Sequence, residues 1–321
     1  MNQDPNKPVR LWIHRLSHHG VILNSDQKHL IAVDVDGTLL NTEFDDVLGA
    51  REIAALKAVR QAGHELALCT GRNTLSVNGL LEKSGWVPDD LPLVLLNGAL
   101  VKGCRPPRQL VCNVLAAEQI TGLIPLFRKH GTMPLVYGTD EDGGVVHHET
   151  RAVNDILGHY LGVRRHTVGA IHTAEDLLEI PWNVALEVGT IDKREKIMAL
   201  TAEIHATWPG QFEVINTRSL LGGGKYYWAE VYRAGSDKGS GLKVLAADLG
   251  ISLAQVVAIG DNYNDLAMFA VAGCSVAMGN SPDDVKTEVH FVAPDIAQNG
   301  AAQVLEQIAA GTFQCGQRTI D

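Results

Sequence analysis

The sequence predicts an α/β fold: a doubly wound, Rossmann-like parallel sheet with a second, α+β domain inserted into it. The main evidence is a set of short apolar runs at residues 30–33, 66–69 and 256–259, each as long as one buried strand. Each run is followed by a turn and then by a stretch with helical spacing. Strands that alternate with helices in this way form parallel sheets that are covered on both faces.

The core is predicted to use both ends of the chain, residues 29–100 and 227–321. Gly63, Gly85 and Gly250 each follow a helical stretch and mark its end. In chain order, the predicted core elements are a strand at 30–33, a helix at 49–62, a strand at 66–69, a helix up to residue 85, a strand at 93–96, a helix from 238 to 250, a strand at 256–259 and a helix at 266–271.

Residues 101–226 follow a different pattern and are predicted to form the inserted domain. The turn at residues 140–143 separates strands at 133–139 and 144–148, which indicates a hairpin. The other predicted elements of the insert are helices at 151–161 and 193–207 and strands at 183–188, 212–216 and 226–232. Residues 1–28 are an N-terminal extension without an assigned role, in which 9–16 and 21–23 are candidate strands.

Composition and charge narrow the range of partners. The chain has 321 residues, 45% of them hydrophobic, which is enough for two cores. Its 27 Lys and Arg residues against 37 Asp and Glu give a formal charge of −10, and no basic run concentrates positive charge. We therefore expect no nucleic-acid or membrane partner. We also expect no signal peptide or membrane span, and the oligomeric state is left open.

The cysteines predict a reducing environment. The chain has five cysteines, at positions 69, 104, 112, 274 and 315, without close pairing or metal-ligand spacing. This pattern favours reduced thiols in the cytoplasm over a disulfide framework. The polar tail from Gly311 onward is expected to be loose.

The segment Asp34-Val35-Asp36-Gly37-Thr38 sets two carboxylates two residues apart, directly after the first predicted strand. Open α/β sheets build their sites at the carboxyl ends of strands. Two acids this close repel each other unless a cation or a proton lies between them, and Mg²⁺ is the hard dication that best suits oxygen ligands. The plainer alternative is an acidic turn without a ligand.

Two later segments have features of phosphate sites. Thr70 and Gly71 end the strand at 66–69 and begin a helix, where backbone N–H groups, the helix dipole and a hydroxyl all favour an anion. Lys238 lies in the first turn of a helix, which is unfavourable unless an anion lies nearby. Taken alone, the first segment could be a helix cap and the second a solvated lysine.

A fourth segment repeats the acidic pattern. Asp261 and Asp265, with Asn264 beside the second, follow the strand at 256–259. Asp265 alone could be an ordinary N-cap for the helix at 266–271.

These four segments, in this order, resemble the motifs of the haloacid dehalogenase superfamily of aspartate-nucleophile phosphatases. The likeness is closest to the Cof-type hydrolases, which carry a type-two cap of subclass B. The family's motifs are met by residues 34–38, by Thr70, by Lys238 and by residues 260–265. Residues 97–99 also resemble the family's usual exit from core to cap, and the resemblance covers nearly everything after residue 28.

The resemblance implies a Mg²⁺-dependent phosphatase that hydrolyses a small phosphorylated metabolite, such as a sugar phosphate, through an aspartyl-phosphate. The insert at 101–226 would be the cap that sets specificity. The implied roles are Asp34 as nucleophile, Asp36 as general acid and base, Asp34, Asp36, Asp261 and Asp265 as the metal site, and Thr70, Gly71, Lys238 and Asn264 as holders of the phosphoryl oxygens.

Two alternatives stay open on the sequence: a phosphomutase of the same superfamily, and a catalytically silent protein that binds a phosphorylated ligand. Dehalogenase activity is disfavoured because Asp36 is present. Arg72 either contacts the substrate or lies along the flank of its helix.

Overall fold

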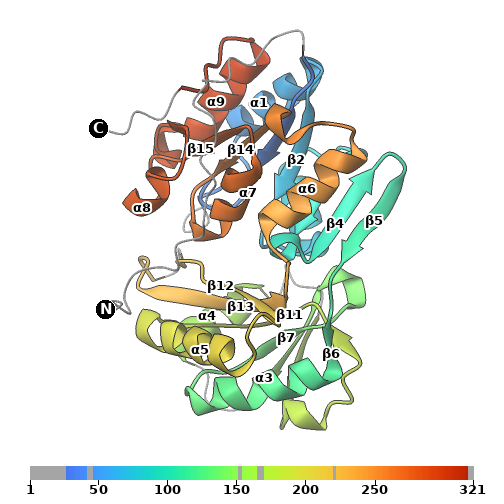
Figure 1. Cartoon of the computed structure of the whole chain (residues 1–321), viewed down its shortest axis with the longest axis vertical. Coiled ribbons are helices and arrows are strands. Elements are labelled where there is room, and N and C mark those ends of the chain that lie inside the picture. The colour runs from blue at the N-terminus through green and yellow to red at the C-terminus, as the bar shows by residue number, and fades with distance from the viewer. Residues whose placement is uncertain (1–26, 42–45, 151–153, 165–169, 220–221, 317–321) are drawn as a thin grey trace.

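The computed structural model describes residues 27–41, 46–150, 154–164, 170–219 and 222–316 (Figure 1). Apart from its last two residues, the N-terminal extension lies outside this range, including the candidate strands at 9–16 and 21–23. The described chain forms two bodies, a core and a cap, each built on its own sheet (Figure 1).

The core sheet has eight strands in the order β16-β15-β14-β1-β2-β3-β4-β5. Its strands are β1 Leu30–Val33, β2 Glu65–Cys69, β3 Leu93–Leu95, β4 Leu100–Cys104, β5 Pro107–Cys112, β14 Val256–Gly260, β15 Cys274–Ala277 and β16 Phe291–Val292. The pairs from β16 through β3 are parallel, and the β3–β4 and β4–β5 pairs are antiparallel. The predicted parallel sheet is therefore confirmed.

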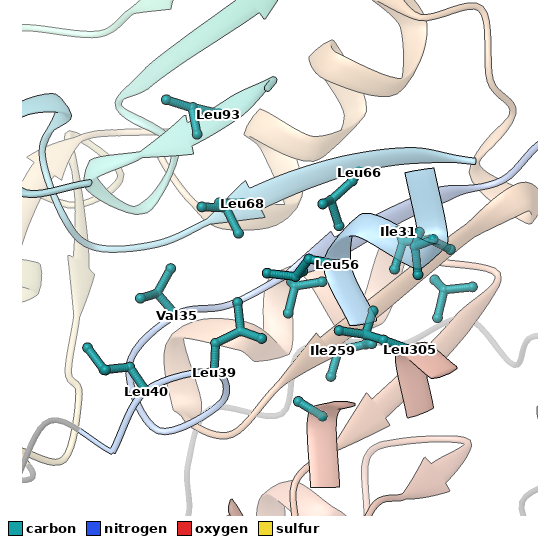
Figure 2. Packing of buried hydrophobic residues seen from close by; sticks show 14 of the residues in the cluster. Ile31, Val35, Leu39, Leu40, Leu56, Leu66, Leu68, Leu93, Ile259 and Leu305 are labelled. Carbon is teal, nitrogen blue, oxygen red and sulfur yellow. The ribbon is translucent and has the colours of Figure 1, made fainter. Parts of the chain in front are cut away.

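Helices cover both faces of this sheet, because successive residues of each buried strand point to opposite sides. They are α1 Ala50–Gln61, α2 Thr74–Lys83, α6 Lys238–Asp248, α7 Leu266–Val271, α8 Asp283–Lys286 and α9 Gly300–Ala309. Ile31, Leu66 and Ile259 pack with Leu56 of α1 and Leu305 of α9 (Figure 2). Residues next to them along the same strands pack against α6 and α7, so the sheet is doubly wound as predicted.

Among its described residues, the cap is a second sheet with three α-helices. Its six-stranded sheet has the order β12-β13-β11-β7-β8-β9. The strands are β7 Leu135–Tyr137, β8 Val145–Glu149, β9 Ala170–Ala174, β11 Glu187–Lys193, β12 Phe212–Ile215 and β13 Tyr226–Arg233, and the helices are α3 Ala117–Lys129, α4 Asp155–Arg164 and α5 Arg194–Thr207. The short strands β6 Leu115–Ala116 and β10 Val184–Ala185 pair separately. Helix α3 was not predicted from the sequence.

The sheet to which each strand belongs indicates where the core ends and the cap begins. Strands β4 and β5 lie beyond residue 100 and still belong to the core sheet, whereas β13 lies beyond residue 226 and belongs to the cap sheet. Two connections join the bodies, one from β5 to β6 and one from β13 to α6 (Figure 1). We therefore propose a cap of residues 113–233 in place of 101–226.

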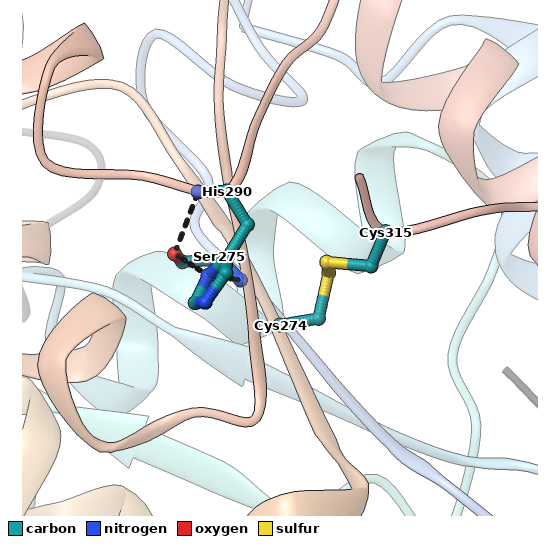
Figure 3. The surroundings of a disulfide bond; sticks show 4 residues. All are labelled: Cys274, Ser275, His290 and Cys315. Carbon is teal, nitrogen blue, oxygen red and sulfur yellow. Dashed lines mark hydrogen bonds between the residues drawn. A yellow bond between two sulfur atoms is a disulfide. The ribbon is translucent and has the colours of Figure 1, made fainter. Parts of the chain in front are cut away.

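The prediction of unpaired cysteines is wrong at two positions. Cys274 of β15 and Cys315 form a disulfide across 41 residues of sequence (Figure 3). The other three cysteines, at positions 69, 104 and 112, are free thiols. The predicted loose tail is also wrong for residues 311–316, because Phe313 is buried and packs edge-on against Phe291 at 5.4 Å between ring centroids. These apolar partners are distant in sequence, so the local polarity of the tail did not predict them.

Among the described residues, no helix is both long enough and apolar enough to cross a bilayer.

Candidate active site

The sequence motifs meet where the strand order of the core sheet reverses. Strands β1 and β14 are parallel neighbours, and the chain proceeds outward from them in opposite directions. Their carboxyl ends therefore lie side by side, which is where open α/β sheets place their sites. Asp34 follows β1, Asp261 follows β14, and Thr70 follows β2 on the other side of β1.

Lys238 connects two of the acids. Its ammonium Nζ lies 2.7 Å from Asp34 Oδ1 and 2.6 Å from Asp265 Oδ1, and the lysine side chain is fully buried. Helix α6 starts at this lysine and is capped by Asp237, which accepts a hydrogen bond from the Ser240 N–H at 2.8 Å. The two carboxylates are the anions that make a lysine tolerable in a first helical turn. The reading of Lys238 as solvated is therefore wrong.

Asp265 organises the loop after β14. Its Oδ2 accepts hydrogen bonds from the backbone N–H groups of Asp261 at 2.8 Å and Asn262 at 3.0 Å. Helix α7 begins at the next residue, but the Asp265 side chain makes no capping hydrogen bond to it. Asp265 thus turns back toward the strand end and does not act as the ordinary N-cap that the sequence left open.

Asp34, Asp261 and Asp265 form the acidic cluster of the core. Carboxylate oxygens from all three lie within 4.8 Å of one another, and all three residues are buried. Asp261 Oδ1 has no hydrogen-bond partner among the described residues, although it is buried. Asp261 lies against Gly37, where a Cβ would come within 2.3 Å of its Oδ2, so the glycine is required for close approach.

The charge of the core cluster is incompletely balanced. Three carboxylates and one ammonium sum to a formal charge of −3 + 1 = −2. Burial raises the pKa of Asp34 to about 7, against the opposing effect of Lys238. Burial, together with Asp34 and Asp265, holds the pKa of Asp261 well above its usual range. Burial would lower the pKa of Lys238, but its two acidic partners raise it. A bound cation would relieve this excess of negative charge.

Asp36 has a different environment from Asp34. Its carboxylate accepts two hydrogen bonds from the Arg72 guanidinium, at 2.6 and 2.8 Å. Arg72 follows Thr70 on the loop after β2, and its backbone N–H donates to Thr70 Oγ1 at 3.1 Å. Arg72 therefore points to the first motif, where it fixes the Asp36 carboxylate in a two-point ion pair.

The remaining predicted residues gather around Asn97. The Asn264 Nδ2 group donates to Asn97 Oδ1 at 3.0 Å. A Cβ on Gly71 would lie 3.2 Å from Asn97 Nδ2, so these residues are in close contact. Thr70 is fully buried beside them. The site residues predicted from sequence thus meet at one sheet edge, although the Asp36 carboxylate is directed to Arg72 and is not part of the acidic cluster.

The cap contacts the core on both sides of this edge. On one side, Asn73 Nδ2 donates to the carbonyl oxygen of Gly143 in the cap turn at 2.8 Å, and Lys102 forms an ion pair with Asp142. On the other side, the Asn262 side chain donates to the carbonyl oxygen of Arg218 at 3.2 Å. Glu230 of β13 also reaches the core, where it accepts a hydrogen bond from Asn97. Sequence reasoning missed Glu230 because it stands outside every motif.

Comparison with known proteins identifies the family of the chain. Residues 31–305 match the family of haloacid dehalogenase-like hydrolases. The chain is 27% identical to the 5-amino-6-(5-phospho-D-ribitylamino)uracil phosphatase YwtE of Bacillus subtilis, over 88% of this chain and 99% of that protein. It is 26% identical to the pyridoxal phosphate phosphatase YbhA of Escherichia coli, over 86% of this chain and 97% of that protein.

A solved structure shares the fold. The sugar phosphatase BT4131, of haloacid dehalogenase subclass IIB, superposes with a TM-score of 0.71 at 19% identity, covering 89% of this chain and all of that one. The resemblance drawn from the four motifs is therefore confirmed. The chain belongs to the haloacid dehalogenase-like hydrolases, whose family pattern it matches over residues 31–305.

Proposed function

We propose that this protein is a Mg²⁺-dependent phosphatase that hydrolyses a small phosphorylated metabolite through an aspartyl-phosphate intermediate. The observation that carries the proposal is the convergence of Asp34, Lys238, Asp261 and Asp265 at the switch point of the sheet. It joins a nucleophile, a cation for the phosphoryl group and an oxygen-rich metal site within one buried cluster.

The donor set fits a magnesium ion. Asp34, Asp261, Asp265 and the backbone carbonyl of Asp36 would hold the ion, and hard oxygen ligands are those that Mg²⁺ prefers. The buried Asp261 Oδ1, which lacks a partner among the described residues, supports this assignment. When bound, the ion would supply positive charge to neutralise the phosphoryl group.

Asp34 is the proposed nucleophile. Lys238 holds its Oδ1, and the Thr38 hydroxyl donates to its Oδ2 at 3.2 Å, so both oxygens have fixed positions. Attack of one oxygen on phosphorus forms the aspartyl-phosphate as the bond to the leaving alcohol breaks. Because a carboxylate is a weak nucleophile, its orientation and the neutralised charge of the phosphoryl group carry most of the catalysis.

Asp36 is the proposed general acid and base. It would protonate the departing alcohol and then accept a proton from the water that hydrolyses the aspartyl-phosphate. The Arg72 fork holds the Asp36 carboxylate away from Asp34, which prevents the two acids from competing for one position. Thr70, Gly71, Lys238 and Asn264 would hold the phosphoryl oxygens.

The proposed substrate is a small metabolite because the cap lies over the site. Its contacts through Gly143 and Arg218 enclose the sheet edge from two sides. Such a cap admits a small ester and leaves little room for a protein substrate. Sugar phosphates and phosphorylated cofactors are the classes to test first, since the named relatives act on pyridoxal phosphate and on a ribityl phosphate. The cytoplasm is the proposed location on the basis of the three free thiols at positions 69, 104 and 112, and the disulfide does not support it.

The test is phosphate release from a panel of phosphorylated metabolites, with Mg²⁺ or with excess chelator. Wild type should release phosphate only with the metal, and Asp34→Asn should lose about 10³-fold or more of this activity while staying folded. Metal-independent release, or release by Asp34→Asn at the wild-type rate, would contradict the mechanism. If no ester is hydrolysed by folded protein, a mutase or a silent binder becomes the better reading.

A further inference from the structure

The face of the cap sheet that is turned to the core carries a second acidic cluster. It consists of Glu187 on β11 and of Glu230 and Tyr232 on β13, and we call it the cap cluster. Ala229 and Val231 of β13 pack into the cap's own hydrophobic cluster with α3 and α5. Glu230 and Tyr232 alternate with them and therefore point to the opposite side, toward Asn97.

Hydrogen bonds join these three residues. The Tyr232 hydroxyl lies 2.9 Å from Glu187 Oε2 and 3.3 Å from Glu230 Oε1. Glu230 also accepts from the Thr217 hydroxyl and from Asn97 Nδ2, each at 3.3 Å. The Tyr232 hydroxyl has one proton, and the shorter distance directs it to Glu187. Glu230 then keeps two donors, Thr217 and Asn97, whereas Tyr232 is the sole hydrogen-bond donor to Glu187 among the described residues.

Because Glu187 has fewer hydrogen-bond donors than Glu230, its carboxyl group keeps a proton. A buried carboxylate with one donor is poorly solvated, so the neutral acid is the stable form there. Burial and the neighbouring Glu230 raise the pKa of Glu187 well above its usual range. Burial raises the pKa of Glu230 to about 7, against its hydrogen-bond donors and Lys238. Tyr137, whose pKa is raised by burial, also lies close to both acids.

Asn97 transmits the position of Glu230 to the core. It is fully buried and has a left-handed backbone, with φ of 49°, next to Gly98. Its amide nitrogen faces two acceptors, Glu230 and the Tyr232 oxygen, so its amide oxygen must face the other way. That oxygen accepts the hydrogen bond from Asn264 Nδ2. An acceptor at position 230 thus determines which end of the Asn97 amide meets Asn264.

We propose that Glu230 is a positioning residue for the active site: through Asn97 it fixes the amide of Asn264, so that this amide is correctly oriented only when the cap lies on the core. The inference rests on the proposed phosphate-binding role of Asn264. One N–H of Asn264 is used by Asn97, and its second N–H is available to a phosphoryl oxygen. Closure of the cap and completion of the phosphate site are then one event.

Exchanging the hydrogen-bond donor and acceptor between positions 97 and 230 tests this coupling. Asn97→Asp keeps the left-handed backbone, which aspartate tolerates, but sets a second carboxylate against Glu230. Asn97→Asp/Glu230→Gln reverses the hydrogen bond, because the new glutamine can donate to the new aspartate, which still accepts from Asn264. Asn113→Asp is the matched control, since it adds the same charge beside Ser236 and away from Glu230.

Two quantities are measured for each variant: the Kd of inorganic phosphate in the presence of Mg²⁺, by calorimetry, and kcat/KM for p-nitrophenyl phosphate. Asn97→Asp should weaken phosphate binding and lower kcat/KM by about tenfold each, and the double variant should return both to within about threefold of wild type. Glu230→Gln alone should change either by about twofold at most, because its amide oxygen still accepts from Asn97.

The proposal is overturned if Asn97→Asp binds phosphate as wild type does. It is also overturned if adding Glu230→Gln to Asn97→Asp fails to restore phosphate binding. Recovery of the Tm without recovery of the Kd would also overturn it, because the contact would then be structural alone. Failure of the proposed function is a separate result: wild type would bind phosphate but hydrolyse no ester. The Kd values would still decide the role of Glu230 in that case.

Discussion

The core cluster and the cap cluster both bury carboxyl groups, but they balance the charge differently. In the core, Asp34 and Asp265 share the ammonium of Lys238 at 2.7 and 2.6 Å. In the cap, Glu187 and Glu230 share the hydroxyl of Tyr232 and have no direct ion pair among the described residues. The core cluster therefore contains a cation that offsets part of its negative charge, whereas the cap cluster is balanced by hydrogen-bond donors and a proton.

The difference corresponds to what each cluster is suited to do. A cluster with excess negative charge and an unpartnered carboxylate oxygen attracts a metal ion. A cluster in which one acid keeps a proton and the other accepts several hydrogen bonds provides directed hydrogen bonds, which suits positioning. Two acidic clusters in one protein can thus serve different purposes because their neighbours differ, and each difference can be tested by changing one neighbour.

The largest effect is expected from Lys238→Met. Removing the ammonium leaves Asp34 and Asp265 buried without their counter-charge, and breaking such a buried pair costs about 3–5 kcal/mol of stability. Phosphatase activity should be lost as well, since Lys238 is proposed to hold the phosphoryl group. The free energy of unfolding, measured in urea, checks the first expectation.

Lys243→Met is the matched control, because Lys243 lies on the same helix but is exposed. It should change the unfolding free energy by less than about 0.5 kcal/mol. Equal effects of the two substitutions would mean that the core cluster does not depend on its lysine.

The core cluster was predictable from the sequence, and the cap cluster was not. Each core acid follows a recognisable buried strand, so chain order and the geometry of parallel sheets bring the acids together. Glu187 and Tyr232 are 45 residues apart, and Asn97 and Glu230 are 133 apart. Their contacts depend on the register of the cap strands and on how the cap lies on the core, and neither leaves a local pattern in the sequence.

The disulfide marks a similar limit in the core. Cys274 and Cys315 come together because α9 leads the tail back along the sheet, where Phe313 is buried. Cys315→Ser should lower the free energy of unfolding by about 2–4 kcal/mol, because it releases a long closed loop in the unfolded chain. Turnover should be unchanged, since neither cysteine belongs to the core cluster. Urea unfolding with and without reductant checks this, and the variant should no longer respond to reductant.

Arg72→Lys tests the separation of the two acids in the first motif. Lysine keeps the charge but cannot form the two-point fork to Asp36, so the proposed general acid loses its orientation. Hydrolysis of an alkyl phosphate should fall by about 10- to 100-fold. Hydrolysis of p-nitrophenyl phosphate should fall less, because nitrophenolate leaves without a proton. An equal loss on both esters would argue that Arg72 serves binding and not Asp36.

The sharpest test of the cap cluster concerns the pH dependence of stability. The pKa of Glu230 rises from 4.5 to about 7 on folding, so the folded protein retains a proton that the unfolded chain releases. Its contribution therefore makes the free energy of unfolding fall as pH increases from about 4.5 to about 7, by about 3 kcal/mol. Glutamine at position 230 cannot ionise, so Glu230→Gln should remove this part of the pH dependence, whereas the exposed Glu175→Gln should leave it unchanged.

Other acids of the site titrate in the same range, so the informative quantity is the difference between wild type and Glu230→Gln in urea unfolding across that range. If the two profiles are parallel, Glu230 takes up no proton in this range, and the raised pKa of the cap cluster belongs to Glu187 alone.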